Sequence, residues 1–368
     1  MNIIYSLIKL KKVYLAPFLF LIFSSCNTEK PSSIFDFERN EKPQFELKGE
    51  KYNFKELANP RKIDQKDGFL IIQENYMVRE NKPLVHIFQK EPFSHFLSKG
   101  VSGEGPGEIS DAEIFDPGLS DSTFWINAVM GKKMALFSLN DTSRLSIKEF
   151  RQPENMMMAY TLYLTNKGTF MSMMADSPNK LIEFDFDGNQ VAGYGEWEQI
   201  PDQPEMDNFL LMTYNKGRLK TNAKKNVFVK ASLYRDRIEI FDYETKRFTI
   251  VDGPRLELPP ANISGSGSNS ALAIPMDQKY GHYNIAVSDN FIFSLYSGYS
   301  QQEITDFGNY AQTIYMISFK GKMIAKFNLD RSLSDIAIDE SLGKIYGITT
   351  DEEPGIAVFD IPKQLLKK

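Results

Sequence analysis

The segment DIAIDESLGKIYGIT, residues 335–349, is an apolar strand, a tight polar turn and a second, more apolar strand. The same unit recurs at residues 61–73, 112–127, 161–174, 218–231 and 284–296. The second strands of the six units begin at Phe69, Thr123, Thr169, Val227, Phe291 and Ile345, in steps of 54, 46, 58, 64 and 54 residues. A unit made only of strands, repeated at intervals of tens of residues, predicts blades closed into a ring.

Each unit continues into two further predicted strands. The third strand often ends in Phe followed by a polar residue, as in Phe137-Ser138, Phe241-Asp242 and Phe359-Asp360. A turn follows, with Gly188 in the third unit and Gly321 in the fifth, because glycine adopts the positive φ that a tight hairpin needs. Fourth strands are predicted at residues 94–97, 145–150, 190–194, 248–251 and 323–327. Each blade is therefore expected to hold four antiparallel strands.

The sixth unit is one strand short. Only nine residues follow Phe359, and Pro362 among them cannot donate to a central ladder. Residues 43–57, PQFELKGEKYNFKEL, alternate in polarity and precede the first unit. We expect them to pair with the last blade, because an open ring would leave two raw sheet edges. The sequence thus predicts an all-β, six-bladed β-propeller over residues 43–362, closed by an N-terminal strand, with residues 363–368 as a C-terminal tail.

Composition restricts the class of partner. The net charge is −5 and the pI about 5.5, so no basic stripe exists to bind a nucleic-acid backbone. His86, His95 and His282 lie far apart in the sequence, and nothing indicates that they converge on a metal. Residues 185–189, DFDGN, resemble a fragment of a calcium loop but lack its closing Glu. No metal and no cofactor are predicted.

The single cysteine, Cys26, ends a segment typical of exported proteins. Lys9, Lys11 and Lys12 precede an apolar run at residues 13–23, and Ser24-Ser25 precede the cysteine. This pattern predicts a signal peptide at residues 1–25, too short to span a bilayer comfortably. Small residues ending on a cysteine resemble the bacterial lipobox, which implies that Cys26 is acylated and holds the protein to the lipid bilayer. The alternative is an ordinary cleaved signal with an incidental cysteine. Residues 26–42 are expected to form a polar tether.

A second motif lies between the first two units. Residues 103–108 read GEGPGE and are followed by Ser110-Asp111, while residues 334–339, SDIAID, look like the inner strand of NHL-type repeats. Together with the lipobox and six blades, the sequence resembles the TolB-like six-bladed propeller lipoproteins of Gram-negative bacteria. The resemblance implies export and lipid anchoring in the envelope, at the outer membrane, with the membrane face left open. It implies no chemistry.

The motif loop has two interpretations. Gly103, Gly105, Pro106, Gly107 and Glu108 could form a constrained structural turn, or they could contribute to a ligand mouth by presenting backbone N–H groups to an anion. The loop lacks the Lys and Ser/Thr of a P-loop and opens no helix, so nucleotide binding is not predicted.

Candidate ligand-binding residues come from the starts of the inner strands, since only these strands face the axis of a propeller. Four of them carry opposite charges, namely Arg61, Arg218, Asp111 and Asp335. The other two, His282 and Tyr283, open the fifth inner strand. Such a mouth could hold a polar ligand, with the two arginines as anchors, or it could be a satisfied internal network.

Two functions follow from these expectations. The first is a non-enzymatic, membrane-anchored envelope lipoprotein that binds or scaffolds a peptide, a glycan or an envelope protein. The second is a channel-site enzyme, such as a calcium-dependent hydrolase or lyase, which needs several carboxylate or Asn side chains converging on the axis. No catalytic residue is predicted, and the sequence favours the binding role.

Overall fold

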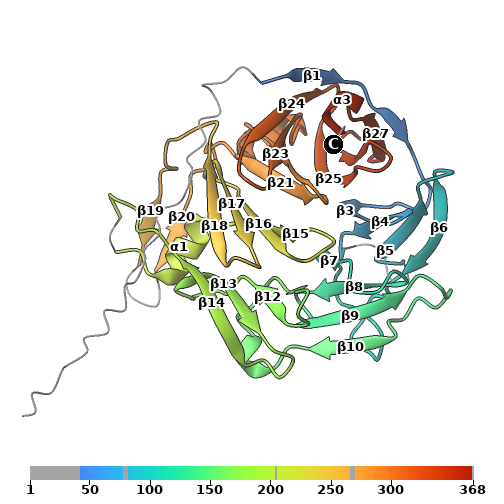
Figure 1. The fold of residues 1–368 in the computed structure, drawn as a ribbon, viewed down its shortest axis with the longest axis horizontal. Helices are drawn as coiled ribbons and strands as arrows, with labels where there is room; N and C mark the ends of the chain where they lie inside the picture. The colour runs from blue at the N-terminus through green and yellow to red at the C-terminus, as the bar shows by residue number, and fades with distance from the viewer. Residues whose placement is uncertain (1–41, 78–81, 204, 266–269, 367–368) are drawn as a thin grey trace, which may run out of the picture. The chain divides into compact units, whose positions relative to one another are not determined.

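The computed structural model describes residues 42–77, 82–203, 205–265 and 270–366. Six antiparallel sheets surround a central axis, each with its first strand innermost (Figure 1). The predicted six-bladed β-propeller is therefore confirmed. The predicted signal peptide (1–25), Cys26 and all of the tether (26–42) but its last residue lie outside the described residues, as do 367–368 of the C-terminal tail.

Blades 1 to 3 follow in chain order, and the strands of each run from the innermost to the outermost. Blade 1 holds β3 (Pro60–Lys66), β4 (Phe69–Glu74), β5 (Val85–Gln89) and β6 (Ser94–Lys99). Blade 2 holds β7 (Ile114–Asp116), β8 (Thr123–Ala128), β9 (Lys133–Ser138) and β10 (Lys148–Arg151). Blade 3 holds β11 (Tyr163–Leu164), β12 (Phe170–Ser172), β13 (Asn179–Phe184) and β14 (Gln190–Glu196).

Blades 4 to 6 repeat the pattern, the last with only three strands of its own. Blade 4 holds β15 (Gly217–Thr221), β16 (Val227–Ser232), β17 (Arg237–Asp242) and β18 (Arg247–Asp252). Blade 5 holds β21 (His282–Val287), β22 (Phe291–Tyr296), β23 (Thr313–Ser318) and β24 (Met323–Leu329). Blade 6 holds β25 (Leu333–Asp339), β26 (Lys344–Thr349) and β27 (Ile356–Asp360).

The N-terminal segment closes the ring in two steps. Strand β2 (Glu50–Tyr52) pairs antiparallel with β27 and completes blade 6, as predicted. Strand β1 (Gln44–Leu47) instead pairs in parallel with β24, the outer strand of blade 5. The prediction that the whole of 43–57 pairs with the last blade is therefore only half right. The segment straddles blades 5 and 6, because Lys48-Gly49 carries the backbone across the junction, where Gly49 packs on the Phe359 ring.

The hydrophobic core is divided among the junctions between blades. Every pair of neighbouring blades shares its own buried cluster, as for Ile71, Val85, Phe124 and Phe137 between blades 1 and 2. The other five junctions are filled in the same way. Because each blade buries its faces only against its two neighbours, a protein of this length needs no single large core.

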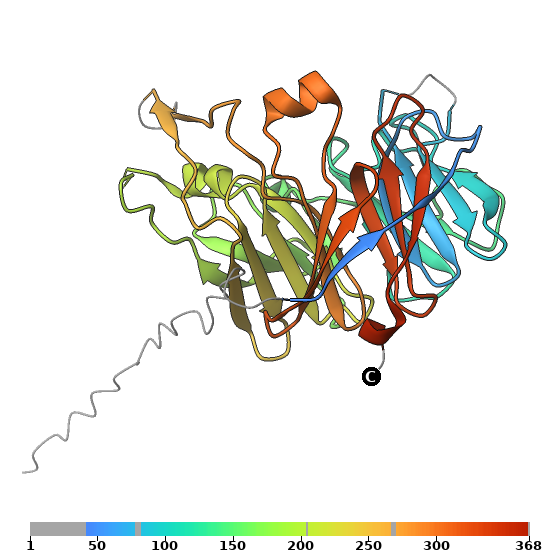
Figure 2. The same ribbon diagram turned by 90° about the horizontal axis from the view of Figure 1, so that it is seen from above.

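The two faces of the ring differ in the length of their connections. The face where the inner strands begin is called the upper face. The face that carries the turns between the first and second strands is called the lower face. The upper face carries η1 (Glu154–Met156), α1 (Asn208–Tyr214), α2 (Gln301–Phe307) and the hairpin of β19 (Asn262–Ser264) and β20 (Ala271–Ala273). Figure 2 shows α2 and β19 projecting on this side and α3 (Lys363–Leu366) on the other.

Local sequence explains why α2 forms in this connection. Ser300 and Glu303 form a reciprocal capping box, which satisfies backbone donors at the helix start. Gly308 ends the helix with φ of 72°, a conformation that glycine adopts without a Cβ penalty. Among the described residues, no helix is long and apolar enough to cross a membrane.

Deleting residues 43–57 should open the ring. Blade 6 would lose its outer strand and β24 would lose its parallel partner, leaving two exposed edges. We expect aggregation and a lower melting temperature, measured by light scattering and calorimetry. Deleting residues 363–368 is the truncation control, because it removes the packing of Leu365 and Leu366 at the same junction but exposes no sheet edge. A 43–57 deletion that stays monomeric with an unchanged melting temperature contradicts this closure.

Candidate functional site

The upper mouth of the channel gathers side chains from the starts of several inner strands. Arg61 and Lys62 come from β3 and Arg218 from β15, and Glu113 precedes β7. Arg61 Nη1 donates to Glu113 Oε1 at 2.5 Å, which links blade 1 to blade 2. The Arg61 side chain nevertheless stays 40% exposed at the mouth. One of the two predicted arginine anchors is thus already ion-paired.

Lys62 and Arg218 are cations without a counter-ion among the described residues. Lys62 is buried, and neither its ammonium nor the half-buried Arg218 guanidinium forms a hydrogen bond or ion pair with that part of the protein. Burial, and then the nearby charge of Arg218, lowers the pKa of Lys62 to about 7, although Asp335 and Glu113 oppose this shift. A buried charge is normally paired. An anion from outside the described residues could therefore supply the missing counter-charge.

Four tyrosines form a wall that includes the start of the fifth inner strand. Ring centroids are separated by 5.6 Å for Tyr234 and Tyr280, 6.0 Å for Tyr280 and Tyr283, and 5.5 Å for Tyr283 and Tyr310. Burial raises the pKa of Tyr283, while the charge of Arg218 opposes that rise. The predicted residues Arg218 and Tyr283 are thus close enough to interact electrostatically at one mouth. Such rings offer flat apolar surface with a polar tip.

Two of the other predicted ligand residues are carboxylates with structural partners. The Asp111 carboxylate accepts from the N–H groups of Val129 and Met130 at 2.8 and 3.0 Å. Asp335 accepts from Ile63 N at 3.0 Å, which clamps blade 6 to blade 1. Asp111 and Asp335 are buried, so neither carboxylate is open to a ligand.

His282 is also removed from the mouth. Its ring is fully buried, with Nδ1 at 2.7 Å from Ser294 Oγ and Nε2 at 3.1 Å from the Gly253 carbonyl oxygen. Burial lowers its pKa to about 4. Sequence reasoning placed His282 at the channel because it opens an inner strand, but its side chain points into the blade.

The motif loop folds around its own carboxylate. Glu108 Oε2 accepts from Gly105 N at 2.8 Å, and Glu149 on β10 accepts from Gly107 N at 2.8 Å. A Cβ at Gly103 would lie 2.1 Å from Glu108 Oε2. Two backbone donors that an anion would need are thus already used. The structural-turn interpretation fits this geometry, and the loop presents no anion cradle.

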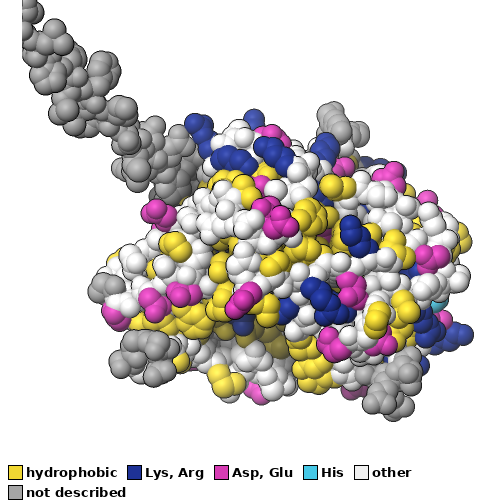
Figure 3. Space-filling model, turned by 90° about the horizontal axis from the view of Figure 1, so that it is seen from below, with side chains coloured by type: hydrophobic (Ala, Val, Ile, Leu, Met, Phe, Trp, Pro, Cys, Tyr) yellow, Lys and Arg dark blue, Asp and Glu magenta, His cyan; other side chains and the backbone are white. Residues whose placement is uncertain are grey.

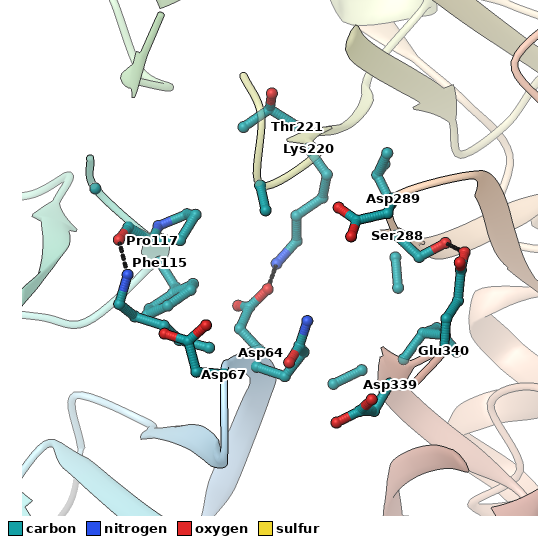
Figure 4. Close-up of a pocket in the computed structure, with 18 of the residues that line it drawn as sticks. Asp64, Asp67, Phe115, Pro117, Lys220, Thr221, Ser288, Asp289, Asp339 and Glu340 are labelled. Carbon is teal, nitrogen blue, oxygen red and sulfur yellow. Dashed lines mark hydrogen bonds and ion pairs between the residues drawn. The ribbon is translucent and has the colours of Figure 1, made fainter. Parts of the chain in front are cut away.

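A cavity of about 450 Å³ lies at the opposite, lower end of the channel. It is formed by the ends of inner strands and the turns that follow them (Figure 4). Six carboxylates and two ammonium groups line it, from Asp64, Asp67, Asp121, Asp289, Asp339, Glu340, Lys66 and Lys220. Sequence reasoning missed this cavity because the turns look like ordinary hairpins. The available signal was an acidic residue at the end of an inner strand or within two residues of it in four blades, namely Asp67, Asp116, Asp289 and Glu340.

An ion pair between two residues that line this cavity crosses the channel. Lys220 of blade 4 donates to Asp64 of blade 1, three blades away, as Figure 4 shows. The two side chains are only 13% and 16% exposed, and Asp64 Oδ2 is buried without a partner among the described residues. Burial raises the pKa of Asp64 to about 6 despite the opposing charge of Lys220.

The alternative function, a channel-site enzyme, needs several carboxylate side chains that converge on the channel axis. In residues 42–366 outside the short undescribed gaps, no group of three or more His, Cys, Asp or Glu side chains is arranged to hold a metal ion. Glu340 and Asp339 are engaged instead with Ser288 and Lys90.

Breaking the cross-channel pair should be costly. Lys220→Met leaves the Asp64 carboxylate buried without its cation, and we expect a loss of about 3 kcal/mol of unfolding free energy. Adding Asp64→Asn should recover most of this loss, because the uncompensated charge disappears. Denaturant unfolding of the two single variants and the double variant measures the coupling. Strictly additive losses would show that the two side chains do not interact.

Gly107 should resist substitution more strongly than a comparable glycine. Its φ is +79°, and an added Cβ would lie 3.0 Å from Leu145 Cβ. We expect Gly107→Val to destabilise the fold by about 1–3 kcal/mol. Gly168 is the control, because its φ is also positive, at +76°, but no atom lies within 4 Å of an added Cβ. Gly168→Val therefore measures the cost of backbone strain alone. Equal losses at both positions would assign the whole effect to strain, and no loss at Gly107 would refute the constrained turn.

Comparisons with known proteins agree with this architecture. Among solved structures, the protein is similar to the β-propeller domain of Cps50 (Swd1) from Myceliophteria thermophila, with a TM-score of 0.46 and 12% identity over 85% of this chain and 100% of that one. It is also similar to a Bacteroides fragilis protein named as exported, with a TM-score of 0.52 and 12% identity over 86% of this chain and 98% of that one. The second likeness supports the fold alone.

No curated protein matches the sequence. The match to a family model covers residues 36–341. This range includes the closing strands, the motif loop and both ends of the channel. The protein therefore belongs to the TolB-like 6-blade propeller-like family.

Proposed function

We propose that this protein is an exported, lipid-anchored binding propeller that holds an anionic group of its ligand at the upper mouth of the channel. The observation that carries the proposal is the pair of cations, Lys62 and Arg218, which have no counter-ion among the described residues. A planar guanidinium beside an ammonium suits a carboxylate, or a sulfate of similar charge.

The satisfied-network interpretation accounts for only part of the mouth. Glu113 is used by Arg61, and Asp335 is used by backbone N–H groups. In the described part of the mouth, neither carboxylate forms an ion pair with Lys62 or Arg218, although both carboxylates lie near enough to favour the Lys62 cation. Tyr283 and Tyr310, the partly exposed members of the tyrosine wall that contact each other, add apolar surface for a ligand, which fits a peptide, a glycan or a segment of an envelope protein.

Direct binding tests the proposal. Glutarate, N-acetylglutamate and trigalacturonate are simple carboxylate probes, and ligand-observed NMR detects even weak complexes. We expect wild-type protein to bind at least one of them, and Arg218→Ala and Lys62→Met to weaken that binding. Lys344→Met is the control, since Lys344 pairs with Asp360 on the lower side. Equal binding by Arg218→Ala and wild type would refute the upper mouth as the site.

The affinity should depend on pH through Lys62. Its cationic form attracts the anion, and with a pKa near 7 that form is lost as the pH rises. Carboxylate binding should therefore weaken about tenfold or more from pH 6 to pH 9, the worth of one charge-assisted hydrogen bond. Lys62→Arg keeps its charge throughout and should bind with little pH dependence. A wild-type affinity that is flat across this range contradicts a role for Lys62.

Export and anchoring rest on the sequence before the described residues. The signal pattern of 1–25 and the lone Cys26 support acylation, with 26–42 as the tether and the outer membrane as the site. Cys26→Ser should release the protein from the membrane fraction of a Gram-negative host, measured by fractionation. Mass spectrometry of the wild-type membrane form should find two or three acyl groups on Cys26. An unmodified Cys26 in that fraction would remove the anchor.

A further inference from the structure

Exposed apolar side chains concentrate on the upper face. Ten of the sixteen exposed large hydrophobic residues among those described lie in its connections. The ten are Tyr76, Met77, Met130, Met157, Met158, Phe209, Leu256, Leu258, Met276 and Phe307. Figure 3, in which this face points to the bottom of the picture, shows apolar side chains exposed along its edge. Exposed apolar side chains mark an interaction site where they lie next to one another, so the contacts between the connections decide which of the ten matter.

The residue type is also selective. All five methionines that the described residues expose are on the upper face, at Met77, Met130, Met157, Met158 and Met276. Methionine is unbranched and polarisable, so it adapts to partner surfaces of different shape. The turns of the lower face, in contrast, expose carboxylates around the cavity.

Part of this apolar rim is built into the wall of the mouth. Met276 and Phe307 belong to one packed unit, because Gln302 N donates to the Met276 carbonyl oxygen at 3.3 Å. Lys279 and Glu303 form an ion pair within it, and Tyr280 Oη donates to Gln301. Tyr280 is in turn a member of the tyrosine wall. A chain of contacts therefore connects the two apolar anchors with the tyrosine wall of the mouth.

We infer that the upper face docks a protein partner, one segment of which places a carboxylate against Lys62 and Arg218 while its apolar side chains pack on Met276 and Phe307. The inference rests on the proposed function and names its partner class. Charge complementarity calls for an acidic side chain or a free C-terminal carboxylate at the mouth. The apolar rim calls for apolar residues close to it in the same segment.

A protein segment suits this surface better than an acidic glycan does. A sugar can stack its C–H face on an aromatic ring, but the exposed methionines of the upper face offer its hydroxyl groups no hydrogen-bond partner. Apolar peptide side chains gain free energy from the same contact. A glycan is therefore the competing outcome of the test.

The experiment selects a random dodecapeptide library, displayed with free C-termini, against the full-length protein. Individual peptides and trigalacturonate are then titrated against wild type and variants. Arg218→Ala removes the anionic contact, and the double variant Met276→Ser/Phe307→Ser removes the apolar one. Leu119→Ser is the matched control, because Leu119 and Met276 are both 64% exposed but on opposite faces. Circular dichroism and melting temperature verify that each variant is folded.

We expect selection of peptides that combine a carboxylate with neighbouring apolar residues. Their affinity should fall about tenfold or more in Arg218→Ala and in the double variant, and it should not change in Leu119→Ser. Failure to select any such peptide overturns the inference. So does a peptide affinity that the double variant retains, or a protein that binds trigalacturonate alone.

The results separate this inference from the proposed function. Small carboxylates or trigalacturonate that bind through Arg218, without any peptide, leave the anion site standing and remove the protein partner. Loss of all binding at the mouth removes both.

Discussion

Ring closure is the constraint on which the rest of this structure depends. Each blade is held by its two neighbours, through junction clusters of modest size, so the last junction must be formed like the others. The protein achieves this with residues that precede the first blade. Strand β2 supplies the missing strand of blade 6, and β1 extends across the junction to blade 5. The positions of the inner strands, and hence both channel mouths, follow from this closure.

Closure brings charges from distant parts of the sequence to one axis, where several of them are buried. Several of these charges form ion pairs that join blades, such as Asp116 with Lys225, or Asp64 with Lys220. The Asp116 carboxylate also accepts from Leu164 N of the next blade, so one side chain links three blades. These contacts fix the inner strands relative to one another. The two upper-mouth cations, Lys62 and Arg218, differ from these residues because they form no ion pair with the described part of the protein.

The two ends of the channel therefore have opposite electrostatic character. The upper mouth combines these two cations with tyrosines, whereas the lower cavity is lined mainly by carboxylates. The Asp64–Lys220 pair crosses the channel where both side chains line the lower cavity. A ligand at one end thus meets mainly one kind of charge.

The sequence predicted the parts of this fold that repeat. Period, strand number and the need for a closing strand all follow from alternating polarity, which local geometry sets directly. The parallel pairing of β1 with β24 was not predictable, because four alternating residues fit the edge of either neighbouring blade.

Of the proposed site, Arg218 and Tyr283 were identified from strand starts. Asp111, Asp335 and His282 could not be told apart from them, since sequence does not show which side chains find partners inside a blade. Lys62 was missed because a lysine beside an arginine in a strand reads as exposed, and only the curvature of the closed ring buries it near the axis.

Hydrogen–deuterium exchange of the full-length protein, with and without N-acetylglutamate, tests the central claim most directly. The account predicts that the ligand protects the inner-strand starts, at Arg61–Ile63 in β3 and Gly217–Leu219 in β15, and leaves the lower turns unchanged. Protection confined to the lower cavity, around Asp289 and Glu340, would contradict it.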